Sequence, residues 1–266
     1  MRTIAIINQK GGSGKTTTAV NLSAALAEQN KKVLLLDLDP QGSASSWLGV
    51  KEGGKGLFEA FTQNKSIYDN TLNTSVNGFS LIPSSPWLIG IDKALAGEVG
   101  TETILQRKLG HGPAGLDYLL IDCPPNLSIL TVNALAAVKE ILVPVEAHVM
   151  ALNGLAQLLQ TIDMVKERLN PTLKISGILP CRVDLRTRHS HEVINELKKH
   201  FGSLVCNVCI RENVRVAECP SFKQPITQYD TKSAGAEDYR RLAAEIIKQE
   251  KMEDTWQKEQ PLATAH

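Results

Sequence analysis

A glycine-rich segment near the start of the chain holds the residues best suited to bind phosphate. Residues 9–17 read Gln-Lys-Gly-Gly-Ser-Gly-Lys-Thr-Thr. Three glycines permit a tight turn whose backbone N–H groups point at phosphate oxygens, and a following helix would add its positive N-terminal end. In such a loop Lys15 reaches the β and γ phosphates, the Thr16 hydroxyl ligates Mg²⁺ and Thr17 lies near the α phosphate. The segment therefore predicts a nucleotide site.

Aspartates follow two further apolar runs, at the ends where an open α/β sheet binds ligands. Asp37 and Asp39 close the run at residues 32–37, and Asp122 ends the run at residues 118–122. A single acidic residue in such a place usually caps a turn, but the phosphate loop changes the interpretation. Phosphoryl transfer requires a positioned water and neutralised charge, which Lys10, Lys15, Mg²⁺ and these carboxylates could supply.

These groups meet only if parallel strands bring them to one edge of a sheet. The chain alternates strand-like and helix-like runs, which is typical of parallel strands joined by helices. The expected strands are residues 3–8, 32–37, 79–82, 118–122, 141–145, 174–179 and 204–210; the expected helices are 15–28, 127–138, 151–169, 191–200 and 236–251. Several strands are apolar on both faces, which is typical of a sheet covered by helices on each side. We expect a single α/β domain, residues 1–251, with a twisted, mainly parallel sheet, and a polar, frayed tail at 252–266.

The composition is that of an ordinary globular protein. The 266 residues are 42% hydrophobic and carry a formal charge of +1, so nucleic-acid affinity would require a local basic patch. Apolar runs are far shorter than the roughly 20 residues of a spanning helix, and the start of the chain lacks the order of a signal peptide. Five cysteines form no disulfide framework and indicate free thiols. We expect a cytoplasmic protein.

The phosphate loop is a variant of the Walker A pattern, because Gln9 stands where that pattern has glycine. The form K-G-G-x-G-K-T-T, with a second lysine at Lys10, resembles the deviant Walker A ATPases of the ParA and MinD family. The resemblance runs from Ile4 to about Ile247 and is closest to small, Soj-like ParA partition ATPases, with matching segments at 37–43, 122–128, 133–135, 151–152, 154–155, 213–215 and 218–221. It implies a P-loop NTPase fold, ATP and Mg²⁺ as cofactors, and slow hydrolysis stimulated by a partner.

The resemblance also assigns residue roles. Lys10 would cross to the phosphates of a partner subunit in an ATP-bound homodimer, Asp39 would position the attacking water, and Asp122 would hold Mg²⁺ through water. Asp37 would lie near the metal or be structural. The implied catalytic residues are Lys10, Lys15 and Asp39, and the implied metal residues are Thr16, Asp39 and Asp122. The implied nucleotide-binding residues are Lys10, Gly11, Gly12, Ser13, Gly14, Lys15, Thr16, Thr17 and Asn213.

ParA proteins of this type bind DNA without sequence preference once ATP has dimerised them. Arg186 and Arg215 match the DNA-contacting arginines of the family by local motif. Residues 182–223 hold eight basic and five acidic side chains, a net charge of +3, and such patches bind DNA phosphates. The resemblance implies a ParB-type or cargo-adaptor partner, association with the nucleoid and no stable membrane association. We expect no site-specific operator binding, because the first strand begins at Thr3, with no helix-turn-helix domain before it.

The chain departs from the family pattern at several positions. His148 and Asn153 stand where relatives have glutamates, and Arg211-Glu212 replaces the usual Pro-Arg. Arg182 lies near the expected adenine site at a position that is often apolar in relatives. We weigh two interpretations of Arg182, stacking on the base and a surface role.

Three alternatives share parts of this pattern. A MinD-like membrane ATPase needs an amphipathic C-terminal helix, but only Met252 and Trp256 would insert. A related ATPase could position a protein cargo such as a carboxysome. An iron–sulfur carrier would use paired cysteines, and Cys206 and Cys209 form a C-x-x-C spacing. Residues three apart in the expected strand 204–210 point to opposite faces, which favours simple packing.

Overall fold

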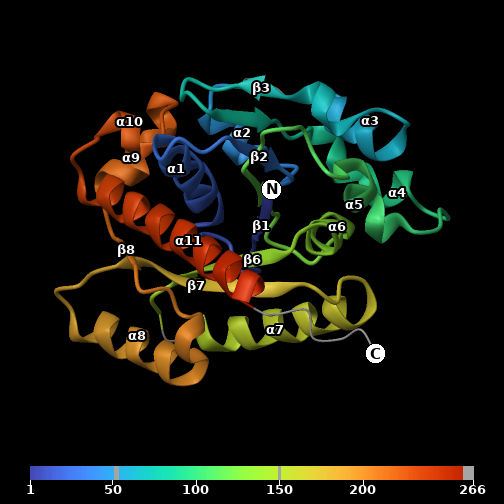
Figure 1. The fold of residues 1–266 in the computed structure, drawn as a ribbon. Coiled ribbons are helices and arrows are strands. Elements are labelled where there is room, and N and C mark those ends of the chain that lie inside the picture. The colour runs from blue at the N-terminus through green and yellow to red at the C-terminus, as the bar shows by residue number, and fades with distance from the viewer. Residues whose placement is uncertain (51–53, 149–150, 260–266) are drawn as a thin grey trace.

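One sheet of mostly parallel strands runs through the molecule (Figure 1). The computed structural model describes residues 1–50, 54–148 and 151–259, the side chains of 151–153 and 251–259 apart. The strand order is β3-β4-β2-β5-β1-β6-β7-β8, and only the β3–β4 pair is antiparallel. The strands are β1 (Arg2–Ile6), β2 (Val33–Asp37), β3 (Leu72–Asn73), β4 (Phe79–Ile82), β5 (Tyr118–Asp122), β6 (Glu140–Glu146), β7 (Lys174–Val183) and β8 (Ile210–Arg211).

Helices cover both faces of this sheet, as its apolar strands require. Alternate residues of β1, and Ile7 after it, enter different cores: Ile4 and Ile6 pack on one face, Ala5 and Ile7 on the other. The first face is covered by α1 (Lys15–Glu28), α2 (Ser43–Trp47), α9 (Val214–Phe222), α10 (Ile226–Tyr229) and α11 (Ala234–Glu259). The second is covered by α3 (Gly56–Thr62), α4 (Ile91–Ala94), α5 (Ile104–Leu109), α6 (Ile129–Ala137), α7 (Ala151–Arg168) and α8 (Arg188–Phe201). The expected α/β fold with helices on both faces is confirmed.

Parallel pairing brings the chemically important residues to one edge of the sheet. Asp122, the last residue of β5, lies opposite Ile6 of β1 and Asp37 of β2 in the strand register. The phosphate loop continues from β1 at the same edge, and Glu146 ends β6 beside it. Four neighbouring strands therefore position the candidate site.

The opposite edge is closed by a buried ion pair. Arg2 at the start of β1 lies 2.7 Å from Glu140 at the start of β6, and both side chains are almost fully buried. Arg2 also donates hydrogen bonds to the carbonyl oxygen of Ile246 and to Gln249, 3.1 Å away. The Tyr118 hydroxyl adds a 2.6 Å hydrogen bond to Glu250. These contacts fix α11 against the ends of three strands.

Most expected elements are present, but the strand expected at 204–210 is wrong. Residues Gly202–Leu204 form a 3₁₀ turn, Val205 makes a single parallel bridge to Ile178 of β7, and Ile210–Arg211 forms the short strand β8. The backbone N–H groups of Asn207 and Val208 donate instead to the Glu245 carboxylate on α11, at 2.9 and 3.1 Å. A long-range partner has taken the donors that a strand would use for pairing.

The end of the last helix also differs from expectation. Helix α11 continues to Glu259, eight residues beyond the expected end at residue 251. Residues 260–266 lie outside the described residues, as do the side chains of Met252 and Trp256. Within the described parts of the chain, no helix combines the length and apolar character needed to span a membrane.

Candidate functional site

The phosphate loop wraps tightly between β1 and α1 because two of its glycines adopt conformations that other residues avoid. Gly12 and Gly14 have φ values of 74° and 92°, and Gly14 is the N-cap of α1. The Asn8 side chain anchors the loop: its amide donates to the Pro144 carbonyl at 2.7 Å, and its oxygen accepts from the Lys10 N–H at 2.9 Å. The loop therefore presents a helix N-terminus at the ligand-binding edge.

Lys15 and the buried carboxylates lie together beneath this loop. Only 7% of Lys15 is exposed, and its ammonium donates to the Lys10 carbonyl at 3.2 Å. Burial lowers the pKa of Lys15, while the negative charges of Asp122 and Asp39 oppose that shift. Burial and the charge of Asp37 raise the pKa of Asp122 well above its usual range, against the opposing effects of Thr16 and Lys15. Lys15 thus lies near the Asp122 and Asp39 carboxylates, and Asp37 lies near Asp122.

The Asp122 side chain fits a metal site. It is fully buried, and neither carboxylate oxygen has a hydrogen-bond partner within normal geometry. Thr16 and Asp39 complete the metal set expected from the sequence, and both line the adjacent cavity. No cluster of three or more His, Cys, Asp or Glu side chains that could hold a metal occurs among the described residues. Mg²⁺ matches this sparse set, because it commonly takes one or two carboxylates and completes its shell with water and phosphate oxygens.

A hydrogen-bond network holds the Asp39 turn. Ser84 donates from its hydroxyl to the Asp39 carbonyl at 2.5 Å, and its own N–H donates to the Ser45 hydroxyl at 2.8 Å. Ser45 in turn donates to Asp37 from both its N–H and its hydroxyl, each at 2.7 Å. Burial raises the pKa of Asp37 to about 6 despite these donors. Asp37 therefore acts as a structural acceptor that ties α2 to β2.

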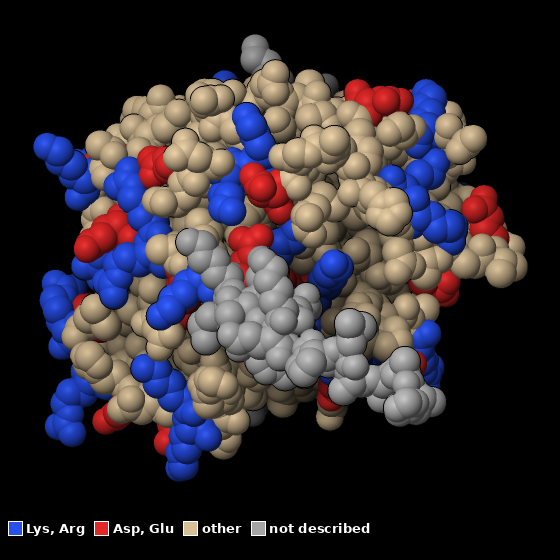
Figure 2. Space-filling model, viewed as in Figure 1, with Lys and Arg blue, Asp and Glu red and all other residues tan. Residues whose placement is uncertain are grey.

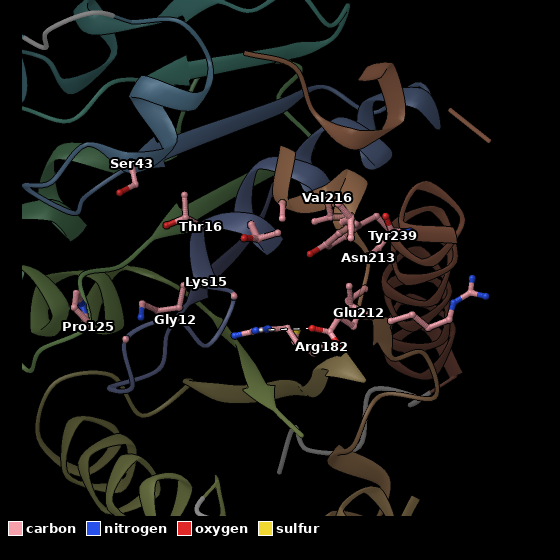
Figure 3. Close-up of a pocket in the computed structure, with 18 of the residues that line it drawn as sticks. Gly12, Lys15, Thr16, Ser43, Pro125, Arg182, Glu212, Asn213, Val216 and Tyr239 are labelled. Carbon is pink, nitrogen blue, oxygen red and sulfur yellow. Dashed lines mark ion pairs between the residues drawn. The ribbon is translucent and has the colours of Figure 1, made fainter. Parts of the chain in front are cut away.

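A cavity of about 520 Å³ extends from the phosphate loop to the start of α9 (Figure 3). Lys15 and Thr16 lie at one end, and Asn213, Val216 and Tyr239 at the other. Of the expected nucleotide-binding residues, the lining includes Gly11, Gly12, Gly14, Lys15, Thr16, Thr17 and Asn213. Lys10 and Ser13 do not line it, and the Ser13 hydroxyl is buried without a partner.

Lys10, which precedes Gly11 of the cavity lining, contacts Glu146, a residue that no sequence motif connects to it. Its ammonium forms an ion pair of 2.8 Å with Glu146, and half of its side chain is exposed. Glu146 also forms an ion pair with Arg182, at 3.1 Å. The hydrogen bond from Lys10 is the main cause of a lowered pKa of Glu146. Glu146 could have been noticed, since it ends an apolar strand at the same sheet edge as Asp37 and Asp122.

Two departures from the family pattern have different surroundings. Arg211 forms a two-pronged ion pair with the buried Asp238 of α11, with a shortest distance of 2.7 Å, and also contacts Glu237. It therefore anchors β8 to α11. The His148 ring lies edge-on to His189, with ring centres 6.3 Å apart. The neighbouring Asn153 side chain lies outside the described residues.

The two candidate DNA-binding arginines do not line the cavity, and each is paired locally. Arg186, 90% exposed, forms two hydrogen bonds of 2.8 Å with Asp184. Arg215 lies 3.0 Å from Glu218 and 3.7 Å from Asp230. Figure 2 shows Lys and Arg side chains gathered along the side that carries α9 above and α8 below, with acidic side chains among them. Acidic side chains therefore interrupt this basic surface.

The cysteines form no cluster suited to an iron–sulfur group. All five are free, and four of them are buried. Cys181 packs beneath the phosphate loop, where a side chain on Gly14 would meet its sulfur at 3.6 Å. Cys206 is buried against Gly177, and Cys209 is half-buried. The C-x-x-C spacing reflects packing around β7 and β8.

Comparisons with known proteins agree with this geometry. A family model described as an AAA domain matches residues 1–175. The chain is 43% identical over 251 residues to the chromosome partitioning protein ParA of Myxococcus xanthus, covering 94% of this chain and 89% of that protein. It is 46% identical over 247 residues to the chromosome-partitioning ATPase Soj of Thermus thermophilus, covering 93% and 96%.

A solved structure gives the same picture of the fold. The cobyrinic acid a,c-diamide synthase of Mycobacterium smegmatis with bound ADP and magnesium superimposes with a TM-score of 0.82 at 33% identity. The match covers 94% of this chain and 96% of that one. A chain with this fold thus holds a nucleotide and Mg²⁺.

Proposed function

The chain belongs to the ParA/MinD family of partition ATPases, and on this premise we propose that it is an ATP-driven switch on DNA. ATP and Mg²⁺ bind at the phosphate loop, two subunits dimerise around the nucleotides, and the dimer binds DNA without sequence preference. Slow hydrolysis, stimulated by a ParB-type or cargo-adaptor partner, releases it. Its place of action is the nucleoid in the cytoplasm. The M. smegmatis structure carries a synthase name, but the higher identity to ParA and Soj favours partition.

The observation that carries this proposal is the burial of Lys15 near the Asp122 carboxylate, whose two oxygens have no hydrogen-bond partner. A buried cation beside a glycine-rich helix N-terminus attracts phosphates, and a buried carboxylate without donors suits a metal ion. Burying these two charged groups costs free energy that their attraction for each other and the Lys15–Lys10 hydrogen bond only partly offset. Their cost to the fold is explained by nucleotide and Mg²⁺ binding.

Each residue of the site has its own role in the proposed hydrolysis. The loop N–H groups and Lys15 bind the phosphates, while Thr16, Asp39 and Asp122 hold Mg²⁺, with Asp122 acting through water. Mg²⁺ neutralises charge that develops on the phosphate oxygens during transfer. Asp39, on a turn fixed by Ser84, orients the attacking water. The apolar end of the cavity, beside Asn213, accepts the base.

The position of Lys10 supports the proposed dimerisation. Its side chain is half exposed at the rim, paired with Glu146 rather than aimed into its own cavity. The triphosphate of a second subunit carries more negative charge than one carboxylate, so Lys10 can exchange Glu146 for that triphosphate. ATP then joins the two subunits, and a dimer doubles the basic surface around Arg186 and Arg215.

The test measures binding to a random-sequence DNA duplex with no nucleotide, with ADP and with ATP plus Mg²⁺, each at 50 and 200 mM salt. We expect tight binding only with ATP and Mg²⁺, and an affinity that falls steeply with salt because counterions are released. The Lys15→Ala variant serves as the control with impaired nucleotide binding, and its DNA binding should not respond to ATP. Equal binding in all three nucleotide states contradicts the switch. Binding to anionic liposomes instead of DNA supports the membrane alternative.

A further inference from the structure

The backbone of Lys10 is fixed in the phosphate loop, while its side chain is free to reorient. Its N–H donates to the Asn8 side chain at 2.9 Å, and its carbonyl accepts from the Lys15 ammonium at 3.2 Å. Asn8 is itself held by the Pro144 carbonyl of β6, at 2.7 Å. About half of the Lys10 side chain is exposed, and its four-carbon stem is flexible. The ammonium can therefore reach different partners from one fixed position in the loop.

The partner that it has in this structure is Glu146, the last residue of the strand that also holds Asn8. The Lys10 ammonium lies 2.8 Å from the Glu146 carboxylate. Opposite charges at this distance attract each other, so phosphates that approach from another subunit have to compete with the carboxylate for the ammonium. The contact with Glu146 thus opposes any role of Lys10 between subunits.

Arg182 allows Glu146 to release Lys10 without losing all of its cations. The Arg182 guanidinium lies 3.1 Å from Glu146 and 4.0 Å from Glu212 (Figure 3). The pairing of β7 with β8 skips Arg182, whose backbone has φ 54°. Because Arg182 stays beside Glu146 when Lys10 leaves, opening the Lys10 contact costs no more than an ordinary exposed ion pair.

We propose that Glu146 is an autoinhibitory contact, which retains Lys10 on its own subunit and so raises the protein concentration needed to form the ATP-bound dimer. This inference rests on the proposed function, because it requires Lys10 to bind the triphosphate of a second subunit. Both subunits have to release their lysines before the dimer is complete. One exposed ion pair favours the retained position by a factor of about 1.4 to 5, so two of them weaken the dimer about 2- to 30-fold.

The test measures the dissociation constant of the dimer by analytical ultracentrifugation, with Mg²⁺ and a non-hydrolysable ATP analogue. Glu146→Gln keeps the size of the side chain and removes its charge, so its dimer should be about 2- to 30-fold tighter than that of the wild type. The same variant should bind ADP with wild-type affinity, because Lys10 does not line the cavity of its own subunit. Glu59→Gln is the matched control: Glu59 forms a similarly exposed pair with Lys65, at 2.6 Å, and its loss should leave the dimer unchanged.

Two further variants establish whether Glu146 acts through Lys10. Glu212→Gln removes another carboxylate beside Arg182, and its dimer should have the wild-type affinity, because Glu212 forms no ion pair with Lys10 in the described part of the chain. In a Lys10→Ala background, Glu146→Gln should not tighten the dimer. If Lys10→Ala forms no dimer at all, the comparison with Glu212→Gln decides the question.

The outcomes separate this inference from the proposed function. A wild-type dissociation constant in Glu146→Gln overturns the inference. An equal gain in Glu212→Gln also overturns it, since any negative charge at this place would then oppose dimerisation, and so does a gain in ADP affinity, which would place Glu146 on the nucleotide of its own subunit. A wild-type protein that stays monomeric with the ATP analogue at every concentration contradicts the proposed function itself.

Discussion

At the level of single residues, Lys15 carries the strongest prediction about binding. Replacing it with alanine removes the buried cation and leaves Asp122 and Asp39 facing the incoming phosphates. Hydrogen bonds to charged groups contribute about 1.5–3 kcal/mol, so Lys15→Ala should weaken ATP binding about 10- to 100-fold. Calorimetric titration measures the change, with exposed Lys166→Ala as the control. Retained affinity would remove Lys15 from the phosphate site.

The Asp39 turn gives a prediction about the rate of hydrolysis. Asp39→Ala should bind ATP and dimerise but hydrolyse poorly, because the water is no longer oriented. Ser84 holds the same turn through the Asp39 carbonyl, so Ser84→Ala should slow turnover about 3- to 10-fold, the effect of about 1 kcal/mol, with unchanged ATP affinity. In the Asp39→Ala background, Ser84→Ala should have no further effect on hydrolysis. Additive losses would show that Ser84 acts by another route.

The cysteines permit a test of burial and its pH dependence. Burial raises the pKa of Cys181 and Cys219 to about 12 and raises that of Cys209 as well. Since the thiolate is the reactive form, alkylation by iodoacetamide should be slow and increase about tenfold per pH unit between pH 7 and 9. Half-buried Cys209 should react first, as peptide mapping would show. A rate that levels off near pH 7 would reveal a thiol with a lowered pKa.

Among the structural elements, the junction of β8 with α11 depends on Arg211. Removing this arginine leaves Asp238, almost fully buried, without its cation. We expect Arg211→Ala to lower the free energy of unfolding by about 2–4 kcal/mol, less than a fully buried pair because Arg211 is partly exposed. Chemical denaturation of Arg211→Ala, Asp238→Ala and the double variant measures the coupling. If the two single losses simply add, the contact does not stabilise the junction.

Element prediction from sequence succeeded where one local pattern sufficed. Helix α1 and strands β4 and β5 have the expected bounds, because the glycine loop and short, mostly apolar runs define them. The short helices α2, α3, α5 and α9 were not predicted, since five to nine residues carry too little periodicity. The strand expected at 204–210 failed because Glu245, far along the chain, takes two of its N–H groups.

At the level of the whole molecule, some residues of the candidate site were predictable from the sequence and others were not. The phosphate loop, Asp39 and Asp122 were readable because each follows a strand at one sheet edge, and the fold then brings them together. The Lys10–Glu146 contact spans 136 positions of sequence, and no local pattern connects those residues. The conformation of Arg182 arises from the shifted pairing of β7 with β8, which the sequence does not display. Contacts between residues far apart in the sequence thus determine these two features, and no local motif reveals them.

The basic side of the molecule supplies the last prediction, which concerns DNA affinity. If Arg186 and Arg215 each contact a phosphate, an ATP-bound dimer uses four such contacts. The variant Arg186→Ala/Arg215→Ala should then reduce the slope of log affinity against log salt by about 3 to 4. Replacing Asp184 should have the opposite effect on DNA affinity, because Asp184 accepts two hydrogen bonds from the Arg186 guanidinium. Asp184→Asn should bind DNA more tightly, since it frees that guanidinium and removes a negative charge.

Fluorescence anisotropy with a labelled duplex, in ATP and Mg²⁺ over a salt series, measures both effects. Light scattering checks that each variant still dimerises, because the two arginines lie outside the nucleotide cavity. Arg168→Ala, at the end of α7, removes one positive charge elsewhere and should leave the slope unchanged. An unaltered slope in the double variant, together with no gain in Asp184→Asn, would show that DNA binds another surface. A smaller salt slope in the double variant, together with tighter DNA binding by Asp184→Asn, would mean that local ion pairs determine how strongly this basic surface binds DNA.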